Sequence, residues 1–308
     1  MVLAVGGLTA CNRGAEDAAP TPTSKSAARA SDCPDAATLP AGTSTHKMTS
    51  HGFEREYLVY TPASYTGRTK VPVVLEFHGY GSTAQQQLLY GNFGPAADRD
   101  GFLVVAPQGQ GLTRHFTLLG PAGGEQDDVV FVSDLIDHLQ QTLCIDPARI
   151  YSTGMSNGGA MTAVLACRLS DKIAAFASVA AVVWGPQCEQ ARTVPIIAFH
   201  GKQDGIVPFD GGRVTCCGNP TIAAVGDTMA NWARHDGCGD PVEEPVKGAV
   251  TVRRWGGCKP GGVVELYVIG DGGHTWPGAT VGGSLLGKVS KDIDASAVIW
   301  DFLESKHL

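Results

Sequence analysis

Short apolar runs alternate with segments of helical periodicity along most of this chain, and the alternation limits the folds that it can adopt. Several of the runs are apolar at almost every position, as expected of strands buried on both faces of a sheet. The expected strands are 55–62, 71–77, 101–109, 149–154, 172–183, 193–201 and 263–270. The expected helices are 127–143, 158–169, 222–237 and 295–306. Strands separated by such helices predict βαβ units, and hence a single α/β domain with a mostly parallel sheet and helices on both faces.

Charge and composition exclude several kinds of partner. The net charge of −7 comes without any run of five basic residues, whereas nucleic-acid binding needs Lys and Arg clustered against phosphates. No apolar stretch approaches the roughly 18 residues of a membrane-spanning helix. The cysteines form no CxxC pair and no Cys/His spacing typical of a zinc site. We therefore expect no nucleic-acid partner, no cofactor and no metal ion, and we also expect a monomer.

The first 45 residues differ from the rest of the chain. Residues 8–11 (Leu-Thr-Ala-Cys) resemble a bacterial lipobox, which predicts a lipoprotein-type signal over 1–11 and a lipid on Cys11. A signal normally starts with basic residues and none is present, so either the sequence begins inside the signal or the stretch is an ordinary apolar leader. Residues 12–45 are rich in Ala, Thr, Ser and Pro, which predicts a disordered tether before a folded domain over 46–308. This organisation predicts an extracellular or envelope protein, attached to a membrane only through its lipid.

An even number of cysteines remains once Cys11 is set aside. The eight are Cys33, Cys144, Cys167, Cys188, Cys216, Cys217, Cys238 and Cys258. In an exported protein this number predicts up to four disulfides, for which 105 connectivities exist. Cys216 and Cys217 are adjacent, and because a bridge between neighbours is strained we expect separate partners for them. Cys238 and Cys258 flank a short segment between an expected helix and an expected strand, and we expect these two to be joined.

A lone serine among glycines follows the expected strand 149–154. Ser156 stands in the pattern Gly154-x-Ser156-x-Gly158, directly before the expected helix 158–169. Strand, turn and helix in this order are the context of a nucleophile elbow, which holds a reactive serine on a tight turn. The turn leaves no room for side chains on its neighbours, and the helix N-terminus directs its positive dipole end at the reacting carbonyl. Such a pentapeptide also arises by chance, so the serine needs an acid and a base elsewhere.

Candidates for the acid and the base follow two later strands, in the chain order Ser, Asp, His. Asp204 lies in a Gly-rich loop after 193–201, and His274 lies in another after 263–270. Function in an α/β sheet gathers at the carboxyl ends of the strands, so both residues can approach Ser156. We predict that His274 takes the Ser156 proton and returns it to a leaving alcohol. Asp204 is predicted to orient the imidazole and to stabilise its cation.

Two backbone N–H groups are predicted to form an oxyanion hole. The sequence His78-Gly79-Tyr80-Gly81 ends an early strand and resembles the HGGG-type loop that supplies one such donor. We assign the donors to the N–H groups of Tyr80 and Asn157, for which position matters more than the side chain.

Other polar and aromatic residues are given different roles because of where they stand. The acids and bases rejected on position are Asp210, Asp271, His235 and His307. His78 and His200 end strands, and we expect both to be structural hydrogen-bonding residues. Trp276 stands two residues beyond His274 in a Gly/Pro loop, and we expect its ring to form a rigid wall of the cleft that binds an acyl group. Burial of this ring in the core is the alternative.

Five segments together resemble the feruloyl esterase and polyhydroxybutyrate depolymerase group of carbohydrate esterase family 1. They are PVVLEFHGYGS (72–82), DDVVFVSDLID (127–137), IYSTGMSNGGAM (150–161), AFHGKQDGIVPFDGG (198–212) and GGHTWPG (272–278). The resemblance runs from about Tyr57 to the C-terminus and implies a secreted α/β-hydrolase that carries the triad predicted above. It also favours the pairing of Cys238 with Cys258, and the lipobox is similar to that of lipoprotein members of the group.

The leading interpretation is a serine carboxylic-ester hydrolase that forms an acyl-enzyme on Ser156. Its expected substrates are hydroxycinnamoyl or acetyl esters, or hydroxyalkanoate oligomers, and the sequence does not rank these acyl groups. An envelope acyltransferase of the same fold would form the same acyl-enzyme and pass it to a sugar alcohol. A catalytically idle envelope binding protein is the third interpretation, which an intact triad disfavours.

Overall fold

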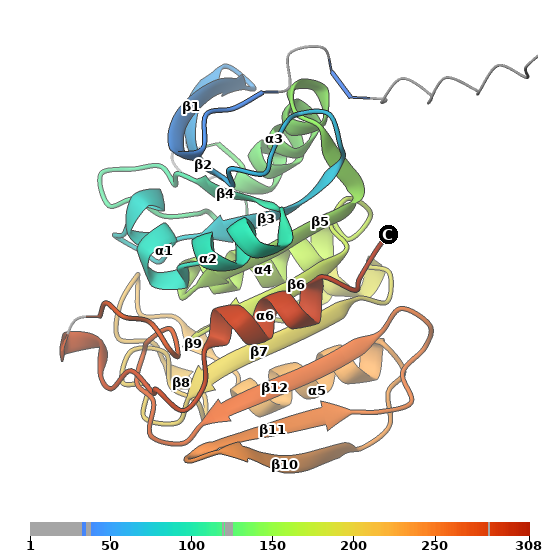
Figure 1. Cartoon of the computed structure of the whole chain (residues 1–308). Coiled ribbons are helices and arrows are strands. Elements are labelled where there is room, and N and C mark those ends of the chain that lie inside the picture. Colours follow the sequence, from blue (N-terminus) through green and yellow to red (C-terminus); the bar gives the residue numbers. More distant parts are fainter. Residues whose placement is uncertain (1–32, 35–37, 119, 121–125, 283) are drawn as a thin grey trace, which may run out of the picture. The chain divides into compact units, whose positions relative to one another are not determined.

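The computed structural model describes residues 33–34, 38–118, 120, 126–282 and 284–308. Within them, ten strands form one sheet in the order β1-β2-β4-β3-β5-β6-β7-β12-β11-β10 (Figure 1). The bounds are β1 Gly42–Ser50, β2 Phe53–Thr61, β3 Val71–Phe77, β4 Leu103–Pro107, β5 Ile145–Met155, β6 Ala175–Val179, β7 Pro195–Gly201, β10 Pro241–Lys247, β11 Val250–Trp255 and β12 Val263–Ile269. The six central strands, from β4 to β12, run parallel, and antiparallel strands flank them at both edges.

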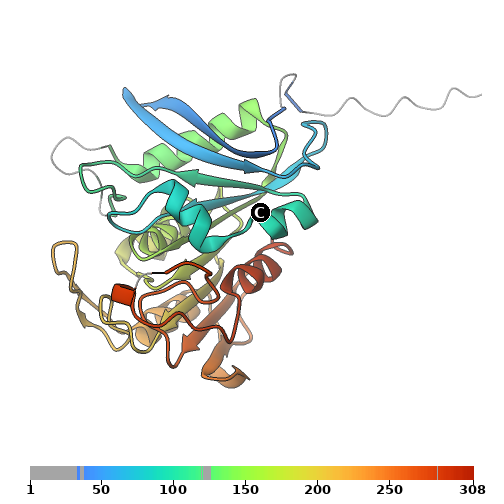
Figure 2. The same cartoon turned by 60° about the vertical axis from the view of Figure 1, so that its left-hand side comes forward.

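Helices cover both faces of this sheet. Their bounds are α1 Ala84–Gly91, α2 Gly94–Asp100, α3 Asp128–Thr142, α4 Asn157–Arg168, α5 Val225–His235 and α6 Ala295–Leu303. Helices α1, α2 and α6 lie on one face, whereas α3, α4 and α5 lie on the other (Figures 1 and 2). Buried residues of the strands alternate between two hydrophobic clusters, one under each layer of helices. The expected α/β domain with a mostly parallel sheet is confirmed. Among the helices described, none is both long and apolar enough to cross a membrane.

The sheet is wider than the sequence predicts. Strands β10 and β11, and the short helices α1 and α2, lie in segments for which no element was expected. Strand β1 begins at Gly42, so the boundary at residue 45 between tether and folded domain is wrong. Its half-buried positions, which alternate with exposed ones, are Gly42, Ser44, His46 and Met48, so only Met48 contributes a large apolar side chain. Pairing with β2 along the whole strand supplies its hydrogen bonds.

Four disulfides join the eight cysteines that the structure describes, while Cys11 lies outside the described residues. The pairs are Cys33–Cys144, Cys167–Cys188, Cys216–Cys217 and Cys238–Cys258. The expected bridge between Cys238 and Cys258 is confirmed. The expectation of separate partners for Cys216 and Cys217 is wrong, because both lie in the loop of the hairpin formed by β8 (Gly212–Arg213) and β9 (Thr221–Ile222). The other six cysteines pair among themselves elsewhere and leave these neighbours to each other.

A buried ion pair connects β2 to the start of α3. The Arg55 guanidinium, 1% exposed, lies 2.6 Å from Asp128 Oδ1 and 3.6 Å from the centre of the Phe131 ring. The other carboxylate oxygen of Asp128 accepts the Thr117 N–H at 2.7 Å. Asp127, rather than Asp128, caps α3 by accepting backbone N–H groups through its side chain. The ion pair therefore fixes the segment around Thr117 against both elements.

A second buried acid, Glu76, lies in the middle of the sheet, and none of the described residues forms an ion pair with it. It is on β3 and fully buried, and Gln87 Nε2 donates to its Oε1 at 2.9 Å. Glu76 is the neighbour of Thr153 on β5, and among the described residues neither Glu76 Oε2 nor Thr153 Oγ1 has a hydrogen-bond partner. Burial raises the pKa of Glu76 to about 8, against which the single bond from Gln87 acts only weakly. Glu76 is therefore mostly protonated at neutral pH.

Substitution of Asp128 by Asn should destabilise the fold strongly. The change keeps the shape of the side chain but leaves the Arg55 charge unpaired in the interior, which costs about 3–5 kcal/mol in the free energy of unfolding. Asp127→Asn is the matched control, because Asn caps a helix as well as Asp does. Urea unfolding of both variants measures the difference. An equal loss in the free energy of unfolding of the two variants would show that the buried ion pair does not account for the destabilisation.

The stability of the protein should fall as the pH rises from 6.5 to 8. In this range the folded state still holds the Glu76 proton, whereas the unfolded chain, with a carboxyl pKa near 4.5, has lost it. The expected loss is roughly 2 kcal/mol, at about 1.4 kcal/mol per pH unit. The buried His78, whose pKa is lowered to about 4, gives an opposite slope only below its ordinary value of 6.5.

Glu76→Gln tests this assignment because the amide does not titrate. The pH dependence of urea unfolding should be markedly flatter in the variant than in the wild type between pH 6.5 and 8. Two parallel curves would mean that Glu76 is ionised in the folded protein.

Candidate active site

Ser156 occupies a sharp turn between β5 and α4. Its φ of 56° lies in a region that residues with side chains rarely adopt, and its hydroxyl does not cap the helix. A Cβ on Gly154 would lie 2.6 Å from the Gly158 backbone, and a Cβ on Gly158 would lie closer still to the Phe77 carbonyl oxygen. Both positions therefore require glycine, as the sequence predicts. The Ser156 N–H donates to the Val179 carbonyl at 2.8 Å, which ties the turn to β6.

Asp204 and His274 are in direct contact at the carboxyl ends of the parallel strands. They follow β7 and β12, which are neighbouring parallel strands, and Ser156 follows the carboxyl end of β5. His274 Nδ1 lies 2.8 Å from Asp204 Oδ2. A backbone hydrogen bond fixes the His274 loop, since the His274 N–H donates to the Leu286 carbonyl at 2.7 Å. The structure thus brings together the acid and the base that were predicted from chain order.

The hydrogen bonds around Asp204 keep it ionised. Burial alone would raise its pKa, but hydrogen bonds from His200 and His274 and from the Val207 N–H hold the pKa well below its usual range. The Ile206 and Val207 N–H groups donate to Oδ1 at 2.9 and 2.8 Å. An acid of this kind can stabilise an imidazolium without taking its proton.

His200 also contacts Asp204, which was not expected from the sequence. Its Nε2 lies 2.9 Å from the Val207 carbonyl oxygen and 3.2 Å from Asp204 Oδ2. The ring is buried and packs edge-on against Phe209. The structural role expected for His200 agrees with these contacts, but its contact with Asp204 was missed. The spacing of four residues across the end of β7 was the available signal.

The loop after β3 lies against the nucleophile. A Cβ on Gly79 would lie 3.4 Å from Ser156 Cβ, so the loop passes within contact distance. Among the described residues, the Tyr80 N–H has no acceptor. Asn157 is the first residue of α4, and its N–H is one of those that a helix leaves without an internal acceptor. Both N–H groups are therefore available to donate to an oxyanion.

His78 supports this loop from the interior. Its Nδ1–H donates to the Gly79 carbonyl at 2.8 Å, and its Nε2 accepts the Gly109 N–H at 2.9 Å. Burial lowers the pKa of His78 to about 4, so the ring is neutral at neutral pH and can accept at Nε2. These contacts agree with the structural role expected from the sequence.

The side chain of Asn157 connects the serine turn to the segment around Thr117. Its Oδ1 accepts the Phe116 N–H at 2.7 Å, and its Nδ2 donates to the Phe116 carbonyl at 3.0 Å. Thr117 is in turn held by Asp128, the partner of Arg55. No pattern in the sequence signals this clamp, because its members lie 41 residues apart along the chain.

Trp276 does not form a wall of the cleft, and the expectation that it binds an acyl group is wrong. Its ring is 1% exposed and packs edge-on against Phe93. Its Nε1–H donates to Ser296 Oγ at 2.9 Å. The loop after His274 therefore turns inward beneath α6, where a large ring and a buried hydroxyl satisfy one another. Among the described residues, no cluster of His, Cys, Asp or Glu is arranged to hold a metal ion.

Comparison with known proteins gives the family. Residues 55–228, more than half of the chain, match the family model described as Esterase PHB depolymerase. Feruloyl esterase B of Piromyces equi is 32% identical over 228 residues, which cover 71% of this chain and 42% of that protein. The chain thus spans less than half the length of that relative. Feruloyl esterase D of Neurospora crassa is 26% identical over 268 residues, which cover 82% of this chain and 84% of that protein.

The fold has a counterpart among solved structures. An acetyl xylan esterase from Aspergillus awamori superposes with a TM-score of 0.61 at 14% identity, covering 84% of this chain and 98% of that chain. At this identity the likeness shows the fold alone, which is that of an α/β-hydrolase. With a strained serine turn and a contacting Asp–His pair at the carboxyl ends of the parallel strands, this chain belongs to the Esterase PHB depolymerase family, the group of feruloyl esterases and polyhydroxybutyrate depolymerases.

Proposed function

We propose that this protein is a serine carboxylic-ester hydrolase in which Ser156, His274 and Asp204 act as a triad. The observation that carries the proposal is the 2.8 Å hydrogen bond between His274 Nδ1 and Asp204 Oδ2, at the edge where Ser156 occupies its strained turn. The backbone N–H groups of Tyr80 and Asn157 are the proposed oxyanion donors.

The reaction proceeds through two acyl transfers. His274 Nε2 takes the Ser156 proton as Oγ attacks the ester carbonyl, and the negative oxygen of the tetrahedral intermediate accepts the two N–H groups. The imidazolium, stabilised by Asp204, then gives its proton to the departing alkoxide and leaves an acyl-enzyme. Water, deprotonated by His274, attacks the acyl-enzyme, releases the acid and restores Ser156.

The proposed substrates are feruloyl and other hydroxycinnamoyl esters, acetyl esters, or hydroxyalkanoate oligomers. Two kinds of relative, the feruloyl esterases and a bifunctional acetylxylan esterase/xylanase, support the first two classes. A panel of feruloyl, acetyl and hydroxybutyrate esters ranks the acyl groups by kcat/KM. Product analysis with and without an added sugar acceptor distinguishes hydrolysis from acyl transfer.

Ser156→Ala, Asp204→Asn and His274→Ala should each lower kcat on p-nitrophenyl acetate, and the serine and histidine variants should lose about 10⁴-fold or more. The double variant of Ser156 and His274 should lose little beyond either single variant, because the residues act as a unit. A fluorophosphonate probe should label Ser156 alone. A Ser156→Ala enzyme that keeps a tenth of wild-type kcat would overturn the mechanism.

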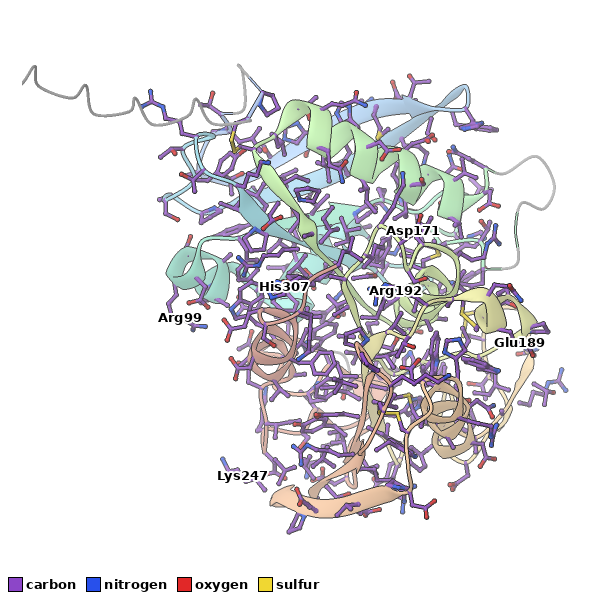
Figure 3. All side chains as sticks on the ribbon, turned by 90° about the vertical axis from the view of Figure 1, so that its right-hand side faces the viewer. Arg99, Asp171, Glu189, Arg192, Lys247 and His307 are labelled. Atoms are coloured by element: carbon purple, nitrogen blue, oxygen red, sulfur yellow. A yellow bond between two sulfur atoms is a disulfide. The ribbon has the colours of Figure 1, made fainter. Side chains whose placement is uncertain are left out.

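Matched controls come from the acids and bases that position excludes. Asp210→Asn changes an exposed aspartate six residues beyond Asp204, and His307→Ala changes an exposed histidine. His307 lies at the amino ends of the parallel strands, which face the viewer in Figure 3. The neighbouring Leu308 N–H donates there to the Ala148 carbonyl, near the start of β5. Both variants should retain wild-type kcat.

The proposal also places the protein outside the cytoplasm, attached to the membrane by a lipid on Cys11. The lipobox-like sequence at 8–11 and the four disulfides support this location, since disulfides persist in oxidising compartments. In cells fed an alkyne fatty acid, the full chain should acquire the label and partition into detergent. Cys11→Ala should abolish both. An unlabelled wild-type chain would exclude the anchor.

A further inference from the structure

His200 places a second imidazole on the carboxylate that supports His274. It lies near the carboxyl end of β7, and its side chain is 1% exposed. Its Nε2 lies 3.2 Å from Asp204 Oδ2, the same oxygen that His274 Nδ1 contacts at 2.8 Å. Two imidazoles therefore share one carboxylate oxygen, and the mechanism of ester cleavage described above uses only His274.

The surroundings of His200 Nε2 decide where the proton of this ring lies. Besides Asp204 Oδ2, the nitrogen lies 2.9 Å from the Val207 carbonyl oxygen. A carbonyl oxygen can only accept, and Asp204 is ionised, so its oxygen accepts as well. Nε2 therefore carries a hydrogen atom that the two acceptors share. His200 is a hydrogen-bond donor to Asp204 and not a base.

The Asp204 carboxylate is fully used by the protein. Its Oδ1 accepts the Ile206 and Val207 N–H groups at 2.9 and 2.8 Å, and its Oδ2 accepts from the two imidazoles. An ionised carboxyl has about four lone-pair sites, so each of these donors occupies one. His274 has to move a proton during the reaction, whereas His200 remains in the core. His200 therefore holds Oδ2 independently of His274.

The His200 ring is itself fixed in direction. It packs edge-on against Phe209, with 5.9 Å between the ring centres, and its backbone pairs with Val268 of β12. The Thr215 N–H donates to the Ile206 carbonyl at 3.0 Å, which ties the turn after Asp204 to the following hairpin. Because the ring and the turn are both held, the Nε2–H group has a defined direction toward Asp204.

We propose that His200 is a positioning residue of the triad, whose Nε2–H holds Asp204 Oδ2 in place for His274 and draws negative charge away from that oxygen. The inference rests on the esterase function proposed above and deepens it. Oδ2 keeps its place while His274 transfers a proton between Ser156 and the leaving alcohol. An oxygen that shares its charge with a second donor also binds the imidazolium less tightly, so His274 returns the proton more readily.

Other charged groups on the elements around this carboxylate lie at or near the surface. They are Lys202, Asp210, Arg213, Asp227, Asp271 and Lys288, of which Asp271 and Lys288 form an ion pair and the other four are exposed. Salt screens such groups, and they are the same in every variant of residue 200. A change in the pH dependence between these variants therefore reports on the Nε2–H donor.

The test replaces His200 by Gln and by Met, two side chains of similar length and shape. The Gln amide offers one N–H to each acceptor, whereas Met offers none. In His200→Met, the acid limb of kcat/KM against pH on p-nitrophenyl acetate should move up by about 0.5–1 pH unit. The reason is that Asp204, with one donor fewer, stabilises the imidazolium more strongly, and His274 must lose that proton to act as a base.

The plateau kcat of His200→Met should also fall about tenfold, because the carboxylate is less well placed. His200→Gln should keep the wild-type acid limb, since it keeps the donor. A His200→Met enzyme with an unmoved acid limb would overturn the proposal, because a merely structural role lowers the melting temperature and kcat without moving that limb. A Gln variant that shifts as far as the Met variant would overturn it as well.

His235→Met is the matched control. His235 also contacts a buried aspartate, with its Nδ1 2.9 Å from Asp236 Oδ1. Asp236 accepts the Val194 N–H directly before β7, at the end of the strand opposite to Asp204. The pH profile of this variant should equal that of the wild type.

A measurement on the wild type decides the matter if His200→Met does not fold. Nitrogen NMR of protein with labelled histidine should assign the Nε2–H tautomer to the ring whose signals disappear in His200→Gln. An Nδ1–H tautomer would overturn the proposal. A wild type that does not cleave p-nitrophenyl acetate would instead overturn the proposed esterase function itself.

Discussion

The turn at Ser156 depends on backbone atoms that come too close together to leave room for a side chain. Gly154 and Gly158 face each other and the Phe77 carbonyl across this gap, and a Cβ on Gly79 would be in contact with the serine side chain. Helix α4 can therefore pack directly on β3 and β5, with its N-terminus directly after Ser156. The strained φ of Ser156 costs of the order of 1–3 kcal/mol, which these contacts and the bond to Val179 sustain.

Two buried carboxyls near this turn show how surroundings decide charge. Asp204 receives hydrogen bonds from two histidines and two backbone N–H groups, and its pKa falls despite burial. Glu76 receives a single amide hydrogen bond, and burial raises its pKa to about 8. The first group suits the support of an imidazolium because it stays ionised. The second is a neutral part of the core, which explains how an acid can lie in the middle of a sheet without a cation.

The segment after β4 serves both the interior and the surface of the site. Near its beginning, the Gly109 N–H donates to His78 Nε2. Further along, the Phe116 N–H donates to Asn157 and the Thr117 N–H donates to Asp128. The same segment contributes Gln110 and Arg114 to the lining of a polar cavity of about 430 Å³. A single loop thus connects the buried Arg55–Asp128 pair with the loop after β3.

By itself the sequence determined the parallel core of the sheet and the residues that follow its strands. Continuous apolar runs mark strands buried on both faces, and glycines at 154 and 158 mark a turn with no space for side chains. Ser156, Asp204 and His274 were predicted as a set because each lies in the turn or loop that follows such a strand. The pattern of apolar residues and the steric requirement for glycine can both be recognised from neighbouring residues in the sequence.

Only the tertiary structure decided the features that depend on distant partners. Strand β1 is a strand because β2 pairs with it, although its first four residues were assigned to a disordered tether from their composition. Trp276 is buried because Phe93 and Ser296 happen to meet it, and Cys216 bonds to Cys217 because the other six cysteines are paired elsewhere. The hydrogen bonds between Asn157 and Phe116, which lie 41 residues apart, are likewise absent from any local pattern. Side-chain direction and long-range pairing arise only when the chain has folded, so no stretch of sequence contains them.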